Sequence, residues 1–386
     1  MTSLTRSPSL ARRVAGVASP VWRMDGWLLA AVAALTVIGT LLVWSSTRAS
    51  LAGAPSGLLQ RHLLNLCIGL GLGGAIAMVD HRWLRAYAPL LYALAMLGLL
   101  LVLTPAGETI NGSHSWIVIG GAFQFQPSEF AKPALVLGLA LLLAEVREDD
   151  VRPRDFDVWL ALGIAAIPMG LVMLQPDLGT TLVLVAITAG VLILSGVRMR
   201  WIAGLAGVAV VAAVIVWQFQ LLEAYQVNRF MAFIDPSLDP RGAGYNSRQA
   251  LITIGSGEVF GKGLFNGGQT TGKFVPEQHT DFVFTVAGEE LGFVGAAAIV
   301  GLLGVVLLRG LKIARECEDR FGALVASGIV CWLAFQMFIN VGMTIGIMPI
   351  TGLPLPFVSY GGTATFANFI AIGLLQAIHI RERSYG

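Results

Sequence analysis

Residues 282–308 read FVFTVAGEELGFVGAAAIVGLLGVVLL, an apolar run long enough to cross a bilayer, for which about 20 helical residues suffice. PEQHTD, residues 276–281, stands directly before it, so the run begins beside a carboxylate, Asp281. Similar apolar runs recur along the chain. We therefore expect an all-α polytopic membrane protein with ten transmembrane helices, near residues 27–45, 62–79, 86–104, 129–146, 158–174, 179–195, 201–219, 282–308, 321–345 and 363–380.

Composition supports this fold class. Of 386 residues, 56% are hydrophobic and 12% charged, against about 45–50% and about 25% in soluble domains. The 46 glycines suit helices that pack in lipid through small residues. A net charge of +2 gives no indication of a nucleic-acid partner. The three cysteines show neither a metal-binding spacing nor a plausible disulfide.

The distribution of Lys and Arg predicts the topology. Seventeen of these residues fall in one set of connections and seven in the other, which places both termini in the cytoplasm. Residues 1–24 and 381–386 are then cytoplasmic tails, and we expect 25–380 to form one transmembrane domain. Because 27–45 is longer than a signal-peptide core of about 7–15 residues, we expect this first helix to be retained.

Two outward-facing connections stand out. We expect residues 220–281 to form a large extracytoplasmic loop between helices seven and eight, and a polar loop of this length is usually functional. Within it, residues 245–254 could form an amphipathic helix that ends at the glycines that follow. The loop near 105–127 carries two β-favouring runs, 116–119 and 122–125, around a Gly-Gly pair, which predicts a small hairpin.

Several charged residues could carry chemistry. Asp281 is either an N-cap of the following helix or a positioned general base, and nothing prevents both. Glu129 and Lys132 lie three residues apart, so they share a helix face. Either the two form an ion pair that fixes helix packing, or Lys132 helps to hold a phosphate-bearing lipid while Glu129 orients it. Glu289 and Glu290 lie about two turns beyond Asp281, and we expect structural polar contacts for them.

Two further stretches need interpretation. GGQTTGK, residues 267–273, matches the spacing of a phosphate-binding loop, but Phe274 replaces its hydroxyl residue and no strand precedes it. Nucleotide binding is therefore rejected. Residues 349–362 interrupt the last two helices with Pro and Gly, which favours a cavity wall, or an outward connection packed against the protein.

Seven motifs together resemble the SEDS family (shape, elongation, division and sporulation). They are QPSE (126–129) with Lys132, QPDLG (175–179), Arg229 before Asp235-Pro236, Gly244-Tyr245 with Gln249, Pro276-Glu277 with HTDF (279–282), GEELG (288–292) and the stretch 340–362. GLPLP (352–356) and GQT (268–270) are more similar to the elongation branch than to the division branch. Two departures are His62, where similar sequences often carry Gln, and Ser115, where many carry Arg.

The resemblance implies a peptidoglycan glycosyltransferase that polymerises lipid II at the periplasmic face of the bacterial inner membrane. The growing glycan would be carried on undecaprenyl pyrophosphate, and the partner would be a class B penicillin-binding protein. The resemblance also implies that Asp281 is catalytic and that substrate is bound by Glu129, Lys132, Arg229 and Gln249. Arg61, Ser359 and His279 are further candidates for substrate binding. A divalent cation, Mg or Mn, is expected from the family, without an identified ligand set. The alternatives are a flippase for lipid II and a scaffold for the penicillin-binding protein.

Overall fold

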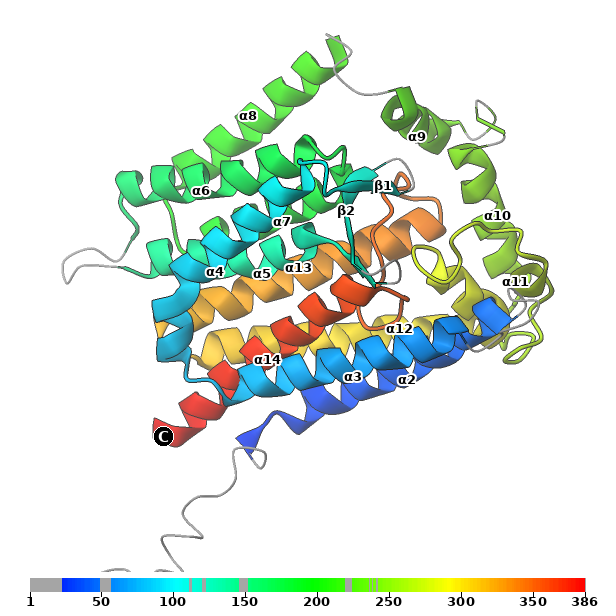
Figure 1. The fold of residues 1–386 in the computed structure, drawn as a ribbon, viewed down its shortest axis with the longest axis horizontal. Coiled ribbons are helices and arrows are strands. Elements are labelled where there is room, and N and C mark those ends of the chain that lie inside the picture. Colours follow the sequence, from blue (N-terminus) through cyan, green and yellow to red (C-terminus); the bar gives the residue numbers. More distant parts are fainter. Residues whose placement is uncertain are drawn as a thin grey trace, which may run out of the picture.

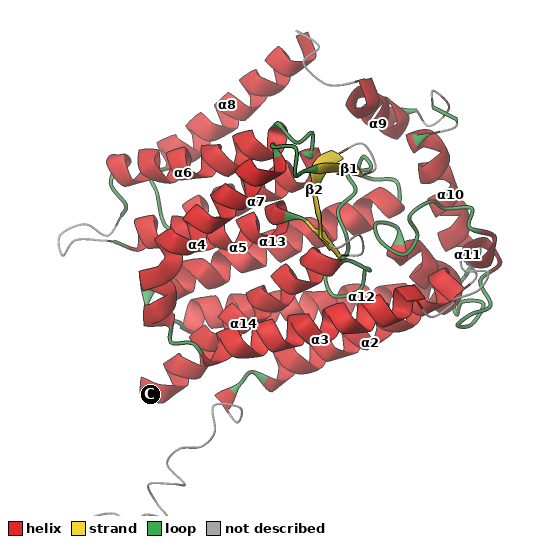
Figure 2. Cartoon of the chain, in the orientation of Figure 1, coloured by secondary structure: helices red, strands yellow, loops and turns green. Residues whose placement is uncertain are grey.

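The computed structural model describes residues 23–48, 57–110, 113–119, 123–145, 152–218, 224–235, 237, 239–240 and 242–385. The described chain is predominantly helical (Figure 2). Its elements, in order, are α2 (Gly26–Arg48), α3 (Gly57–Met78), α4 (His81–Val102), β1 (Glu108–Ile110), β2 (Ser113–Ile119), β3 (Phe123–Phe125), α5 (Pro127–Ala144), α6 (Asp155–Met173), α7 (Leu178–Leu194), α8 (Met199–Gln218), α9 (Ala224–Ile234), α10 (Ala243–Gly255), α11 (Gly268–Gly272), α12 (Val283–Glu316), α13 (Arg320–Thr344) and α14 (Gly362–Tyr385).

Eight helices of the described chain are long and apolar enough to cross a membrane: α2, α3, α4, α5, α6, α12, α13 and α14. The remaining two expected segments coincide with α7 and with the first part of α8, which are apolar but shorter. The protein is therefore a multi-pass membrane protein whose helices follow the apolar runs of the sequence.

The long helices lie side by side in one bundle (Figure 1). α3 packs along α14 and α2 along α12, while α13 contacts α12, α7 and α5. α9, α10 and α11 gather at one end of the bundle, and the N-terminal end of α2 lies with the C-terminus at the opposite end (Figure 1). α8 diverges from the other helices toward α9 in the same view.

Glycines allow the backbones of α3 and α14 to approach closely. A Cβ added at Gly73 of α3 would meet the carbonyl oxygen of Phe369 at 2.6 Å, and one added at Gly373 of α14 would meet the carbonyl oxygen of Gly73 at 2.4 Å. Only residues without a side chain permit backbones to approach so closely. Small residues therefore fix the α3–α14 pair.

α12 is longer than the expected 282–308 and is interrupted at Gly292, whose φ of 67° and ψ of −167° are not helical. The backbone groups released by this break are paired by the preceding loop. Lys262 N donates to Glu289 O at 3.0 Å, and Phe293 N donates to Glu258 O at 2.9 Å. Irregular backbone within a membrane helix persists where protein groups satisfy it. The loop is thus held against the N-terminal part of α12.

The smaller elements partly match expectation. α10 confirms the helix expected over 245–254, whereas α9 and α11 were not expected. β2 and β3 form the expected antiparallel pair, with Ile117 opposite Phe125. β1 adds a third strand on the other side of β2, with Thr109 opposite His114. Three residues are too few for the alternating pattern that predicts a strand.

Candidate active site

Asp281 lies in the turn that leads into α12, outside the helix itself. The N-cap position of α12 falls on Phe282 rather than on Asp281, and Phe282 makes no side-chain capping bond. The Asp281 carboxylate faces the irregular segment between α13 and α14, because a Cβ built on Gly352 would lie 3.5 Å from its Oδ2 atom. Gly352 has a φ of 77°. A larger residue there would be strained and would crowd the carboxylate.

The turn that carries Asp281 is held from several sides. Asn340 of α13 donates its Nδ2 to the Asp281 carbonyl oxygen at 2.8 Å, and Tyr360 N donates to the His279 carbonyl oxygen at 2.9 Å. Gln278, which is buried, donates Nε2 to the carbonyl oxygen of Thr270 in α11 at 2.8 Å. These bonds fix the backbone on both sides of Asp281.

The electrostatic environment raises the pKa of Asp281 to about 7. Loss of hydration is the largest cause, the charges of Glu277 and Asp177 add to it, and Arg229 of α9 acts in the opposite direction. A carboxylate with a pKa near the working pH is well matched to general base catalysis. The same shift shows that Arg229 and Asp177 lie within electrostatic reach of Asp281.

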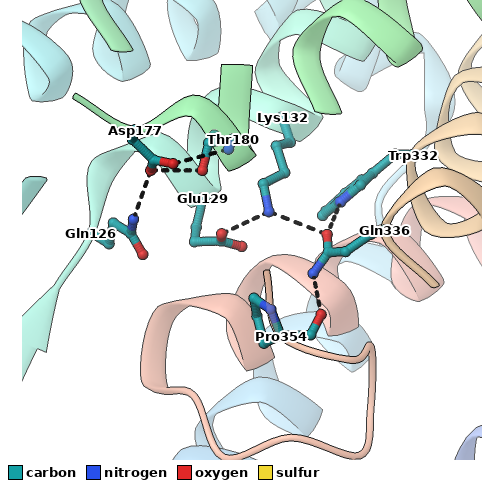
Figure 3. Close-up of polar contacts among 8 residues, drawn as sticks. All are labelled: Gln126, Glu129, Lys132, Asp177, Thr180, Trp332, Gln336 and Pro354. Atoms are coloured by element: carbon teal, nitrogen blue, oxygen red, sulfur yellow. Dashed lines mark hydrogen bonds and ion pairs between the residues drawn. The ribbon is translucent and has the colours of Figure 1, made fainter. Parts of the chain in front are cut away.

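Glu129 and Lys132 form a buried ion pair on α5, with Nζ and Oε1 2.6 Å apart. Lys132 is 0% exposed, and its Nζ also donates to Gln336 Oε1 at 3.3 Å and lies 5.3 Å from the centre of the Trp332 ring. Figure 3 shows Gln336 between Lys132 and the backbone of Pro354. Glu129 Oε2 has no hydrogen-bond partner among the described residues. The pair thus retains hydrogen-bonding capacity inside the bundle.

Asp177 caps α7 beside this pair (Figure 3). Its Oδ1 accepts from Thr180 N at 2.9 Å, and its Oδ2 accepts from Gln126 Nε2 at 3.3 Å. The two helix-opening motifs of the sequence, at 126–129 and 175–179, therefore meet in space. The contact could not be inferred from the sequence, because the two motifs are far apart in the chain.

The other expected binding residues lie at different places. His279 packs its ring 5.6 Å from that of Tyr360, and exposed Arg61 acts electrostatically on Tyr360. Ser359 Oγ accepts from Leu355 N at 2.8 Å, so its hydroxyl stabilises a turn. Gln249 is partly buried on α10, one residue before Ala250, which packs near Phe282. Arg229 thus lies within electrostatic reach of Asp281 and His279 lies in the same turn, whereas Ser359 stabilises a neighbouring turn and Gln249 lies on α10.

Glu289 and Glu290 have the structural contacts that were expected. Glu289 accepts from Thr270 N and Thr270 Oγ1, both at 2.8 Å, from Gln269 N at 2.9 Å and from Lys262 Nζ at 3.0 Å. Glu290 accepts from Ser45 Oγ of α2 at 2.5 Å. Glu289 therefore attaches α11 and its loop to α12.

The described part of the chain does not identify the ligands of the expected divalent cation. It contains no group of three or more His, Cys, Asp or Glu side chains arranged to hold a metal ion. The described residues thus offer no protein ligand set.

Two residues at the site carried no expected role. Gln336 and Asn340 are fully buried amides one turn apart in an otherwise apolar helix. Polar side chains in a membrane helix usually face a partner inside the bundle, and this signal could have identified them.

Comparisons with known proteins agree over the whole described fold. A family profile described as "Cell cycle protein" (FTSW_RODA_SPOVE) matches residues 26–384. The chain is 36% identical over 361 residues to the "Peptidoglycan glycosyltransferase MrdB" of Escherichia coli (strain K12), which covers 93% of this chain and 94% of that protein.

Two solved structures are similar throughout. One is described as "Structural coordination of polymerization and crosslinking by a peptidoglycan synthase complex", with a TM-score of 0.78 at 34% identity, covering 93% of this chain and 98% of that one. The other is the Thermus thermophilus rod shape determining protein RodA, with a TM-score of 0.67 at 32% identity, covering 92% and 96%. The chain belongs to the FtsW/RodA/SpoVE (SEDS) family of cell cycle proteins.

Proposed function

We propose that this protein is a peptidoglycan glycosyltransferase that extends glycan strands during cell elongation, with Asp281 as its general base. The reaction class is supported by the 36% identical MrdB relative, which bears that activity in its name. The similarity to the Thermus thermophilus rod shape determining protein supports a role in elongation. The observation that carries the assignment of the base is the partly buried Asp281 carboxylate, whose environment raises its pKa to about 7.

The proposed substrate is lipid II, and the proposed reaction inverts the anomeric carbon. The 4-hydroxyl oxygen of the acceptor sugar attacks the anomeric carbon of a glycan chain carried on undecaprenyl pyrophosphate. The new glycosidic C–O bond forms as the bond from carbon to the diphosphate oxygen breaks, and the diphosphate leaves with the electron pair. Asp281 accepts the proton of the hydroxyl group. One carboxylate suffices, because a diphosphate leaving group requires charge stabilisation more than protonation.

Cationic groups of the chain would supply that stabilisation. Lys132 is held in place by Glu129 and Gln336, and Arg229 already acts on the charge of Asp281. Arg61 would stabilise the diphosphate from the start of α3. Gln249, His279 and Ser359 complete the proposed binding region. A divalent cation bound with the diphosphate is proposed from the family resemblance alone, and none of the residue roles given above depends on it.

The proposed topology has ten membrane helices, formed by α2–α8 and α12–α14. Both tails, 1–24 and 381–386, would lie in the cytoplasm, and the loop 220–281 would lie on the periplasmic side of the inner membrane. Its elements gather at the end of the bundle opposite the C-terminus, which supports this orientation (Figure 1). A class B penicillin-binding protein is the proposed partner, because the similar solved structure with the TM-score of 0.78 is a peptidoglycan synthase complex.

Purified lipid II and the purified chain, with its cognate class B penicillin-binding protein, provide the test. We expect glycan strands from the wild-type protein and none from Asp281→Asn, provided that both proteins melt normally and bind the partner equally. Normal polymerisation by Asp281→Asn would refute the assignment of the base. Movement of lipid II across vesicles without strands from either protein would favour a flippase, and partner binding without either activity would favour a scaffold.

A further inference from the structure

Three side chains form a line along one face of α13. Trp332, Gln336 and Asn340 are four residues apart, so they lie one above another. Each is 0% exposed. Trp332 Nε1 donates to Gln336 Oε1 at 2.7 Å, which orients the Gln336 amide. Buried amides inside a membrane bundle require partners, and their partners show what they connect.

The two amides bind consecutive carbonyl groups of the irregular segment 345–361. Gln336 Nε2 donates to Pro354 O at 2.8 Å (Figure 3), and Asn340 Nδ2 donates to Leu353 O at 2.7 Å. Gly352, whose backbone faces the Asp281 carboxylate, directly precedes these two residues. The wall beside Asp281 is therefore positioned by α13.

Each amide also binds one half of the candidate site. Gln336 Oε1 accepts from Lys132 Nζ at 3.3 Å, and Asn340 Nδ2 donates to Asp281 O at 2.8 Å. If the amides only satisfied loop carbonyls, contacts to Leu353 and Pro354 would be enough. Their additional contacts are with the proposed cation and the proposed base.

We propose that Gln336 and Asn340 are positioning residues, and that they form an amide ladder that holds Lys132 and Asp281 in one fixed frame. The ladder touches neither the attacking hydroxyl nor the diphosphate. It sets the distance between the group that accepts the proton and the group that stabilises the leaving charge. This inference rests on the proposed function and deepens it.

The ladder predicts a specific kinetic effect. Asn340→Leu keeps the branching of the side chain at Cγ but removes the donor to Asp281 O and Leu353 O. Gln336→Met removes the donor to Pro354 O and the acceptor for Lys132 Nζ. Misplacement of a reacting group by about 1 Å lowers rates on the order of 10²-fold, so we expect kcat to fall by that order with little change in KM. Because either substitution alone already disrupts the relative placement of Lys132 and Asp281, the double variant Gln336→Met/Asn340→Leu should be no slower than the slower single variant.

The pH–rate profile provides a readout that mere destabilisation would not move. Asp281 is surrounded by Glu277 of its own turn, by Asp177 of the α7 cap and by Arg229 of α9. Release of its backbone in Asn340→Leu would let water reach the carboxylate, so the acidic limb of the profile should move to lower pH. A smaller amount of folded protein would lower the rates equally at every pH.

Asn368 provides the matched control. It is a buried asparagine of α14 whose Oδ1, like that of Asn340, has no partner among the described residues. Asn368→Leu is the same substitution in another helix and should retain the wild-type pH profile. Asn340→Ala, which removes the donor without adding bulk or charge, carries the test if Asn340→Leu does not fold.

The measurement is lipid II polymerisation by the full chain with its class B partner, per folded molecule. A lower kcat, a shifted acidic limb and non-additivity would support the ladder. A kcat for Asn340→Leu or Asn340→Ala within about threefold of wild type, with an unshifted profile, would overturn it. If wild-type protein made no strands, the proposed function would fail instead, so the two failures are distinguishable.

Discussion

The pH dependence of polymerisation follows from the environment of Asp281. Burial, Glu277 and Asp177 raise the pKa of this carboxyl group to about 7, against the opposing effect of Arg229. A general base acts only when ionised. About a tenth of the molecules are then competent at pH 6 and about nine-tenths at pH 8, so we expect kcat/KM to rise about tenfold over this range. An aspartate with an ordinary pKa would give a flat profile.

Two substitutions shift the midpoint of this profile in opposite directions. Glu277→Gln removes a negative charge that raises the pKa of Asp281, so the midpoint should move to lower pH. Arg229→Gln removes a positive charge that lowers the pKa of Asp281, so the midpoint should move to higher pH. Arg229 is also a proposed binding residue, and a lower plateau for its variant would not affect the midpoint.

Initial rates of polymerisation at low lipid II concentration, between pH 5.5 and pH 9, are the assay. Glu258→Gln is the control, because Glu258 is an exposed carboxylate of the loop before α12 and is not one of the charges that shift the pKa of Asp281. A flat profile between pH 6 and pH 8 would refute the reasoning. So would a shift of both variants in the same direction.

Three further predictions concern stability and local order. Lys132→Met leaves Glu129 buried without its cation and should lower the free energy of unfolding by about 3–5 kcal/mol, whereas the double variant Glu129→Gln/Lys132→Met should recover most of that loss. Equal decreases in the melting temperature of the single and double variants in detergent would contradict this. Because the pKa of Asp281 is raised in the folded protein, ionisation of its carboxyl group opposes folding as the pH rises from about 4 to 7. Asp281→Asn should therefore have a higher melting temperature than wild type at pH 8 and the same one at pH 4, and equal melting temperatures at both pH values would contradict the raised pKa. Glu289→Ala leaves the N–H groups of half-buried Gln269 and buried Thr270 unpaired, at a cost of about 1–3 kcal/mol for the buried donor, and should speed limited proteolysis within 256–273. Glu108→Ala, at an exposed residue, is the control, and an unchanged digestion rate in Glu289→Ala would contradict the role of Glu289 as an anchor.

Much of the fold could be predicted from local sequence. The apolar runs predicted the long helices because a bilayer requires about 20 apolar residues in each. The apolar run after Asp281 falls almost entirely within α12, and 245–254 lies within α10. The break at Gly292 could not be predicted, because the apolar pattern continues through it. It depends on hydrogen bonds from the loop at 258–263, which form only when that loop folds back on α12.

The sequence by itself determined the membrane class, the helix positions, the family resemblance and the candidacy of Asp281, Glu129 and Lys132. Each of these depends on composition or on residues within one helical turn of each other. Only the tertiary structure placed Asn340 against the Asp281 carbonyl, Gln336 against Lys132 and Glu289 against α11. Asn340 and Asp281 are 59 residues apart, and Lys132 and Gln336 are 204 residues apart. Such contacts arise from helix packing, which brings together side chains that share no local periodicity.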